Sequence, residues 1–139
     1  MNQDRILAQI PNTLTETDFP MGKLYKGKVR DNYLMEGKRV IIATDRISAF
    51  DKVIGTLPFK GQILQAVSNF WFEKTENIIE NHIIDSPDPN VVIVKECQVL
   101  PVEVIVRRHI TGSLWRDYEK GARNIYGIDF PENLLQNHR

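Results

Sequence analysis

A very short connection between two apolar runs constrains the fold more than any other feature of this sequence. Residues 24–35 and 39–44 both have the composition of β-strands, and only Glu36-Gly37-Lys38 separates them. Strands joined by so short a turn run antiparallel, because a parallel crossover needs about a dozen residues or more. Gly27 divides the first run into two strand pieces. The sequence therefore predicts an antiparallel sheet built from consecutive strands.

A long amphipathic pattern over residues 62–80 predicts the main helix. Its apolar residues recur at the period of an α-helix with one buried face; they are Ile63, Leu64, Val67, Phe70, Trp71, Ile78 and Ile79. Gln65 and Ser68 fall on the opposite side. We expect the apolar stripe to pack on the sheet. The predicted fold class is α+β: an antiparallel sheet with a long packing helix, plus the beginning of a second lobe.

The remaining segments are shorter and less regular. Residues 45–61 are polar and rich in turn-forming residues, so we interpret them as irregular. Residues 86–90, with the sequence SPDPN, are interpreted as a turn that follows the helix. The apolar runs 91–95 and 99–107 predict two further strands.

Composition excludes several classes of protein. The chain has 139 residues, with 18 Lys and Arg against 18 Asp and Glu, so no overall charge attracts nucleic acid or an anionic membrane. Its longest apolar stretches are strand-sized and interrupted by charge, which does not suit a membrane span. Residues 1–5 (MNQDR) do not resemble a secretory signal. We predict a soluble, cytoplasmic protein without affinity for nucleic acid or membranes.

The first candidate site is the segment KGKVRD at residues 26–31. A glycine lets backbone N–H groups approach an anion closely, and alternation places Lys28 and Arg30 on one face of an extended chain. Two cations so placed can clamp the phosphates of a nucleotide. The alternative is a basic edge strand that aids solubility and deters edge pairing. The segment is neither a Walker A loop nor a kinase glycine-rich loop.

The second candidate site is the segment TDRISAFD at residues 44–51, directly after a buried strand. The carboxylates of Asp45 and Asp51 and the hydroxyl of Ser48 could hold ribose hydroxyls, an amine or hydrated magnesium. Turns in which Asp and Ser side chains satisfy local backbone groups explain the same residues equally well. Both interpretations stay open.

The third candidate site lies around two residues that share one face of an extended segment, Glu103 and Arg107, where the carboxylate could hold the guanidinium in place. Ser113 is predicted as the N-cap of a helix over residues 114–120, with Gly121 at its C′ position. An arginine beside a helix N-terminus suits a phosphomonoester. The alternative is an internal ion pair beside an ordinary helix cap.

Several of these stretches together resemble the SAICAR synthases. The strongest match is to the first signature motif of that family, which is formed by residues 99–107 and, after three residues, by Thr111-Gly112-Ser113. Further stretches resemble the longer variant of the family: residues 25–31, 44–51, 60–61 and 114–118. The resemblance extends from about residue 20 to the last residue.

The resemblance implies an ATP-dependent ligase of de novo purine biosynthesis. Such an enzyme joins L-aspartate to the carboxylate of CAIR, a phosphoribosyl aminoimidazole acid, and yields SAICAR, ADP and phosphate. The implied course is transfer of the γ-phosphoryl group to the carboxylate and attack of the amine on the acyl phosphate, with Mg²⁺ as cofactor. It also implies an ATP-binding lobe over residues 1–98, similar to a protein-kinase N-lobe. Residues 99–139 would then be the hinge and the incomplete start of a second lobe.

The resemblance also implies roles for individual residues. The ATP phosphates would be covered by Gly27, Lys28, Val29 and Arg30. The hinge beside adenine would run from Lys95 to Val99. The 5′-phosphate of CAIR would be held by Arg107 and Ser113. The substrate side of the cleft would be lined by Asp45, Ser48 and Asp51.

One departure from the family pattern bears on activity. The second family motif, D-x-K-x-E-F-G, does not occur in residues 1–139, and with it go the acidic residues expected to hold magnesium. No metal ligand is therefore predicted here, and a phosphoryl-transfer site without that charge stabilisation loses most of its rate. We expect a C-terminally truncated fragment of the ligase. The alternatives are a non-catalytic nucleotide-binding module and a plain structural or interaction domain. An exposed half-cleft predicts self-association.

Overall fold

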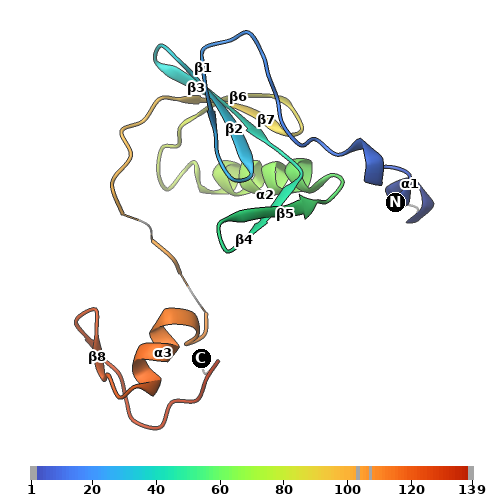
Figure 1. Ribbon diagram of the computed structural model, residues 1–139. Coiled ribbons are helices and arrows are strands. Elements are labelled where there is room, and N and C mark those ends of the chain that lie inside the picture. Colours follow the sequence, from blue (N-terminus) through green and yellow to red (C-terminus); the bar gives the residue numbers. More distant parts are fainter. Residues whose placement is uncertain (1–2, 103, 107, 138–139) are drawn as a thin grey trace. The chain divides into compact units, whose positions relative to one another are not determined.

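The computed structural model describes residues 3–102, 104–106 and 108–137. The chain divides into two compact units, Met1–Gln98 and Val99–Arg139 (Figure 1). No helix in the described part of the chain is both long enough and apolar enough to cross a bilayer.

The first unit is built on a five-stranded antiparallel sheet in the order β1-β2-β3-β7-β6. Its strands are β1 (Lys23–Lys26), β2 (Arg30–Met35), β3 (Lys38–Ala43), β6 (Ile83–Asp88) and β7 (Val91–Lys95). A short α1 (Gln3–Leu7) and a 3-10 helix, η1 (Ile10–Asn12), precede it. Met35 pairs with Lys38 across the turn, and Gly37 has a φ of +70°, which glycine adopts without strain. The predicted antiparallel arrangement around this turn and the α+β class are confirmed.

Two predictions for the connecting segments are wrong. Residues 45–61 are not irregular, because they contain a hairpin of β4 (Arg46–Ala49) and β5 (Lys52–Thr56). Part of the stretch predicted as a turn, residues 86–88, belongs to β6. Pro87 is tolerated there because β6 is an edge strand whose pairing with β7 is irregular.

One face of the sheet packs against the segment that precedes β1. Tyr33, Val40 and Ile42 form the centre of this core, and Leu14 and Met21 pack against them. The Tyr33 hydroxyl donates to Oγ1 of Thr17 (2.9 Å) and accepts from the backbone N–H of Phe19 (3.0 Å). A buried tyrosine whose hydroxyl is satisfied on both sides fixes the N-terminal segment to the sheet.

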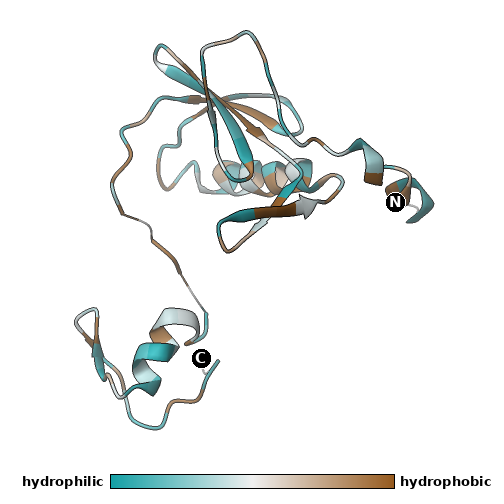
Figure 2. Ribbon diagram, viewed as in Figure 1, coloured by the Kyte–Doolittle hydropathy of each residue, from teal (hydrophilic) through white to brown (hydrophobic). Residues whose placement is uncertain are grey.

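Helix α2 (Lys60–Thr75) crosses the other face of the sheet, and its orientation contradicts the prediction. Its buried residues are Gly61 and Gln65, whereas most of its large apolar side chains are exposed; Trp71, for example, is 59% exposed. The exposed set is Ile63, Leu64, Val67, Phe70 and Trp71. Figure 2 shows that hydrophobic and hydrophilic residues alternate along the ribbon of α2. The helix packs through Gly61, which brings its first turn against the Ala43 carbonyl.

The second unit is organised around Tyr118. Helix α3 (Gly112–Glu119) and the hairpin of β8 (Asn124–Ile125) and β9 (Ile128–Asp129) enclose a small core that includes Ile110. The Tyr118 hydroxyl donates to the Pro131 carbonyl (2.7 Å) and accepts from the N–H of Leu134 (3.0 Å). This unit therefore has its own core and its own polar ties.

Two further sequence predictions concern the second unit. The prediction of a strand over residues 99–107 is wrong, because the described residues of this segment form no strand and are exposed. A strand needs a second strand to pair with, and none is described beside this segment. Helix α3 begins at Gly112 with Thr111 as its N-cap, so the N-cap prediction for Ser113 is also wrong. Gly121 follows the C-cap with a φ of +101°, as predicted for the C′ position.

Substitution of Gly61 by alanine tests the close approach of α2 to β3. A Cβ atom at this position would overlap the Ala43 carbonyl oxygen and carbon, both of which are backbone atoms. We expect Gly61→Ala to destabilise the fold by about 2 kcal/mol or more, although alanine normally favours a helix over glycine. Urea unfolding followed by circular dichroism measures this change.

Gly55→Ala is the matched control, because a Cβ atom at Gly55 meets nothing within 4 Å. The control should change the free energy of unfolding by less than about 1 kcal/mol. Equal effects of the two substitutions would show that α2 does not depend on this contact.

Candidate functional site

The loop between β1 and β2, residues 27–29, turns its carbonyl groups toward the protein. The Gly27 and Lys28 carbonyls accept from the guanidinium of Arg46 (2.9 and 3.0 Å), and the Val29 carbonyl accepts from the hydroxyl and N–H of Thr44 (2.9 and 3.1 Å). A trans peptide points its N–H opposite to its C=O. The N–H groups of Lys28 and Val29 therefore face outward, as in loops that bind anions.

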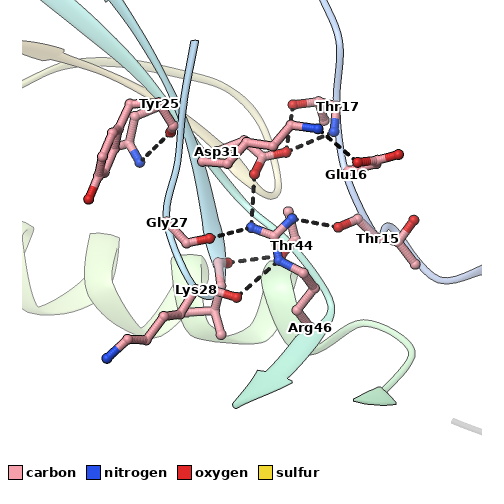
Figure 3. A network of polar contacts seen from close by, with 12 residues as sticks. Thr15, Glu16, Thr17, Tyr25, Gly27, Lys28, Asp31, Thr44 and Arg46 are labelled. Carbon is pink, nitrogen blue, oxygen red and sulfur yellow. Dashed lines mark hydrogen bonds and ion pairs between the residues drawn. The ribbon is translucent and has the colours of Figure 1, made fainter. Parts of the chain in front are cut away.

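Arg46 is the centre of the network that holds this loop (Figure 3). It is buried, and besides the two loop carbonyls it donates to the Thr15 carbonyl and to Oδ1 of Asp31 (2.8 Å). Every side of the guanidinium fork is used, which fixes its orientation. One side chain from β4 thus ties the β1–β2 loop to the N-terminal segment.

Asp31 is the buried counter-ion of Arg46, with no exposed surface. Its other oxygen, Oδ2, accepts from the N–H (2.7 Å) and the hydroxyl (3.0 Å) of Thr17. Burial alone raises the pKa of a carboxyl, but the bonds from Arg46 and Thr17 outweigh it and hold the pKa of Asp31 below 3.8. Its ionised form therefore stabilises the fold above pH 3.8, and this contribution is lost as the pH falls through the lowered pKa.

An exposed ion pair joins the first two candidate sites. Nζ of Lys28, in the loop, lies 2.5 Å from Oδ1 of Asp51, at the tip of the β4–β5 hairpin. This bond and the charge of Lys28 lower the pKa of Asp51. Phe50, beside it, has a φ of +48° and is 100% exposed. The fold thus brings a basic and an acidic residue into contact although they are 23 positions apart in sequence.

The other residues of the second candidate site have different surroundings. The Asp45 carboxylate is buried and accepts from the N–H of Gly61 and the N–H of Leu14, each at 2.9 Å. It therefore caps the first turn of α2 and fixes the N-terminal segment, and both of these backbone groups are distant from Asp45 in sequence. Ser48 lies exposed on β4, where the pairing with β5 is irregular.

The residues expected at the hinge and at the third site lie near or beyond the division of the chain. Lys95 ends β7, where it pairs with Lys38, and Val99 is the first residue of the second unit. Arg107, like Glu103, is outside the described residues. Ser113 is exposed in the first turn of α3.

Sequence reasoning missed the residues that hold the loop: Arg46, Asp31, Thr17 and Thr44. Arg46 and Asp31 both lie inside the segments that were singled out, but a buried ion pair between them could not be distinguished from two solvated charges. The position of Asp31 in the sequence could have indicated the buried ion pair, because side chains alternate along a strand and Asp31 therefore lies on the same sheet face as Tyr33.

The described residues do not offer a metal site. No group of three or more His, Cys, Asp or Glu side chains among them could hold an ion. The Asp45 carboxylate is directed to backbone amides, and the Asp51 carboxylate is directed to Lys28.

Comparisons with known proteins agree on one family. The sequence model described as SAICAR synthetase matches residues 23–137. A phosphoribosylaminoimidazole-succinocarboxamide synthase of Legionella pneumophila (strain Lens) is 48% identical over 134 residues, which are 94% of this chain and 43% of the relative. The chloroplastic enzyme of that name from Arabidopsis thaliana is 41% identical over 143 residues, covering 100% and 33% of the two chains.

The similar solved structures are SAICAR synthases as well. The SAICAR-synthase from Saccharomyces cerevisiae complexed with SAICAR has a TM-score of 0.80 and 32% identity, covering 89% of this chain and 50% of the other. A type-2 SAICAR synthetase in complex with ADP has a TM-score of 0.61 and 26% identity, covering 79% and 47%. The chain thus spans about half, or less, of the length of the proteins it matches.

Replacement of Arg46 by methionine tests whether the buried ion pair holds the loop. Methionine keeps much of the side-chain volume but leaves the Asp31 carboxylate buried without its counter-ion. We expect Arg46→Met to destabilise the fold by about 3–5 kcal/mol. Urea unfolding at neutral pH measures the loss.

Arg39→Met is the matched control, since Arg39 makes a two-bonded ion pair with Glu96 at the surface. The expected change there is about 1 kcal/mol or less. A loss at Arg46 no larger than the loss at Arg39 would contradict the central role of this residue.

Proposed function

The chain belongs to the SAICAR synthetase family, and we propose that it supplies the nucleotide-binding part of an ATP-dependent ligase. The proposed reaction joins L-aspartate to the carboxylate of CAIR and yields SAICAR, ADP and phosphate in purine biosynthesis. Two relatives support this proposal by what they hold: one solved structure is complexed with SAICAR and another with ADP.

The observation that carries the proposal is the outward-facing β1–β2 loop. Its carbonyls are bound on the inner side by Arg46 and Thr44, so the N–H groups of Lys28 and Val29 are directed to the outer side. Lys28 adds a cation at the same place, and Arg30 follows directly. Backbone amides together with two cations suit the phosphates of a nucleotide. We assign Gly27, Lys28, Val29 and Arg30 to the ATP phosphates.

The Lys28–Asp51 ion pair indicates how the phosphates are received. Both side chains are more than half exposed, so the pair gains little from being made and can be exchanged at small cost. Phosphate oxygens would take the place of the Asp51 carboxylate on Nζ of Lys28. Asp51 is then available on the substrate side of the site, together with Ser48. Asp45, the third residue assigned to that side, contributes by capping α2.

The remaining assignments follow from family membership. Lys95 and Val99 would flank the segment beside adenine, and Arg107 and Ser113 would hold the CAIR 5′-phosphate. In the reaction the bond from the γ-phosphorus to ADP breaks as one to a carboxylate oxygen of CAIR forms. The aspartate amine then attacks the carbonyl carbon, loses a proton, and inorganic phosphate leaves. Positioning and charge neutralisation are the protein's share of this chemistry.

Magnesium would neutralise phosphate charge in such a reaction. The described residues hold no cluster of ligands that fits it, so no step is assigned to the metal here. The motif D-x-K-x-E-F-G does not occur in residues 1–139. We therefore expect these residues to bind ATP and to need the remainder of the family fold for turnover.

Lys28→Ala tests the nucleotide site. Loss of one charge-assisted bond to phosphate should weaken ATP binding by roughly tenfold or more, measured by calorimetry with the full chain. Lys52→Ala, an exposed lysine on the β4–β5 hairpin, is the matched control and should change the affinity less than about twofold.

Turnover separates a ligase from a non-catalytic module. ADP release with CAIR and L-aspartate is to be measured with and without a separately produced C-terminal half of the Legionella pneumophila relative. Rescue of turnover supports the ligase. ATP binding without turnover in either mixture supports the nucleotide-binding module instead. No heat of binding at millimolar ATP would reject both.

The exposed apolar face of α2 leads us to propose self-association. Large side chains such as Phe70 and Trp71 lie together on one side of the helix and face away from the sheet. A contiguous apolar patch of this kind drives association. Sedimentation velocity over a concentration series should show species larger than the monomer. In the double variant Val67→Gln with Trp71→Gln, the protein concentration at which these species form should rise at least about tenfold. Glu73→Gln on the same helix is the control, and a clean monomer at high concentration would contradict the proposal.

A further inference from the structure

The tip of the β4–β5 hairpin has a backbone conformation that its own residues disfavour. Ala49 pairs with Lys52, so the turn consists of only two residues, Phe50 and Asp51, and their φ values are +48° and +64°. A two-residue turn in which both φ values are positive is normally formed by Asn and Gly. A bulky side chain with a positive φ is an outlier, and such outliers cluster at ligand sites.

The surroundings of the tip account for one of these two residues only. The Asp51 carboxylate lies 2.5 Å from Nζ of Lys28, so this side chain ties the tip to the β1–β2 loop. The Phe50 side chain is 100% exposed and therefore packs on nothing in the described part of the chain. An aromatic ring left in water contributes nothing to stability through burial. The fold alone thus gives no reason for a phenylalanine at this position.

The hairpin is fixed at its base and little supported near its tip. At the base, Arg46 donates to two carbonyls of the β1–β2 loop. Toward the tip, Val53 and Ile54 of β5 are at least half exposed. The register of the strand pairing shifts between these two parts, next to Ser48. A strand bends where its pairing is irregular, so the tip can move while the base stays in place.

The ion pair places the Phe50 ring beside the loop that we assign to the ATP phosphates. Adjacent Cα atoms are only about 3.8 Å apart, so Phe50 is held near any group that Lys28 binds. A phenyl ring offers no hydrogen bond to a phosphate, but it can displace water. Exclusion of water from a transferring group strengthens the electrostatic interactions around it and prevents its hydrolysis.

We propose that Phe50 covers the phosphate end of the bound nucleotide and excludes water from it. The inference rests on the proposed function, because the β1–β2 loop must hold ATP for the ring to have a ligand. Phosphate oxygens that replace the Asp51 carboxylate on Nζ of Lys28 release the tip, which then closes over them. Without this cover, water would accept the γ-phosphoryl group in place of the substrate carboxylate, and ATP would be lost as ADP and phosphate.

Phe50→Asn tests the ring, because asparagine suits the turn. Asparagine adopts a positive φ readily, so the urea midpoint of this variant should stay the same or rise. Its ATP affinity, measured by calorimetry with the full chain, should fall by about fivefold or more, since the ring no longer buries apolar surface on the ligand. Phe50→Tyr keeps a ring and should stay within about twofold of the unchanged chain.

Tyr126→Asn is the matched control. Tyr126 is the first residue of the two-residue turn of the β8–β9 hairpin, has a φ of +56° and is 81% exposed. It lies in the second unit, on a hairpin that has no residue assigned to ATP. Tyr126→Asn should therefore leave the ATP affinity unchanged. Equal losses of affinity in Phe50→Asn and Tyr126→Asn would overturn the inference.

Cleavage by chymotrypsin, which cuts after aromatic residues, reports on the ring directly. Mass spectrometry gives the cleavage rates after Phe50 and after Tyr126 in the same sample. A saturating non-hydrolysable ATP analogue should slow cleavage after Phe50 by at least about fivefold and leave cleavage after Tyr126 unchanged.

The remaining outcomes separate this inference from the nucleotide site itself. Unchanged or faster cleavage after Phe50 in the presence of bound nucleotide would overturn the cover and leave the nucleotide site standing. Weaker self-association of Phe50→Asn with unchanged ATP affinity would also overturn it, and would assign the ring to a protein contact. Absence of any ATP binding would reject both the cover and the proposed function.

Discussion

The buried ion pair between Arg46 and Asp31 is the interaction on which the first unit depends. Charges removed from water destabilise a protein unless their geometry is satisfied on all sides, and here it is. Arg46 bonds two carbonyls of the β1–β2 loop, a carbonyl of the N-terminal segment and Asp31. Asp31 bonds Thr17 in return. The same contacts that stabilise the sheet also give the loop the conformation that we assign to phosphate binding.

Helix α2 shows how packing by one glycine can override a hydrophobic pattern. The Asp45 carboxylate caps its first turn, and Gly61 sets that turn against the Ala43 carbonyl. These two contacts fix the position and rotation of the helix. Its polar stripe then faces the sheet and its apolar stripe faces outward. Between the helix and the sheet lies a cavity of about 200 Å³ that is lined by both polar and apolar side chains, among them Gln65 and Ile41.

The sequence was sufficient for those parts of the fold that depend on neighbouring residues. The turn at Glu36-Gly37 set the antiparallel pairing, and the motifs around Lys28 and Asp51 identified segments that the fold brings into contact. The rotation of α2 was beyond prediction, because periodicity reveals an apolar face and not what covers it. Arg46 was missed for a related reason: burial of a charge depends on partners distant in sequence.

The β4–β5 hairpin was missed because its turn uses unusual residues. Two-residue hairpin turns with positive φ are usually formed by Asn and Gly, whereas here Phe50 and Asp51 adopt φ values of +48° and +64°. Side chains in this conformation carry strain that persists only where other contacts compensate for it. The ion pair of Asp51 with Lys28 is one such contact, and Phe50 has none because it is fully exposed. A ligand phosphate that displaced Asp51 would therefore release a strained tip, so the hairpin and the phosphate loop should respond to a nucleotide as one unit.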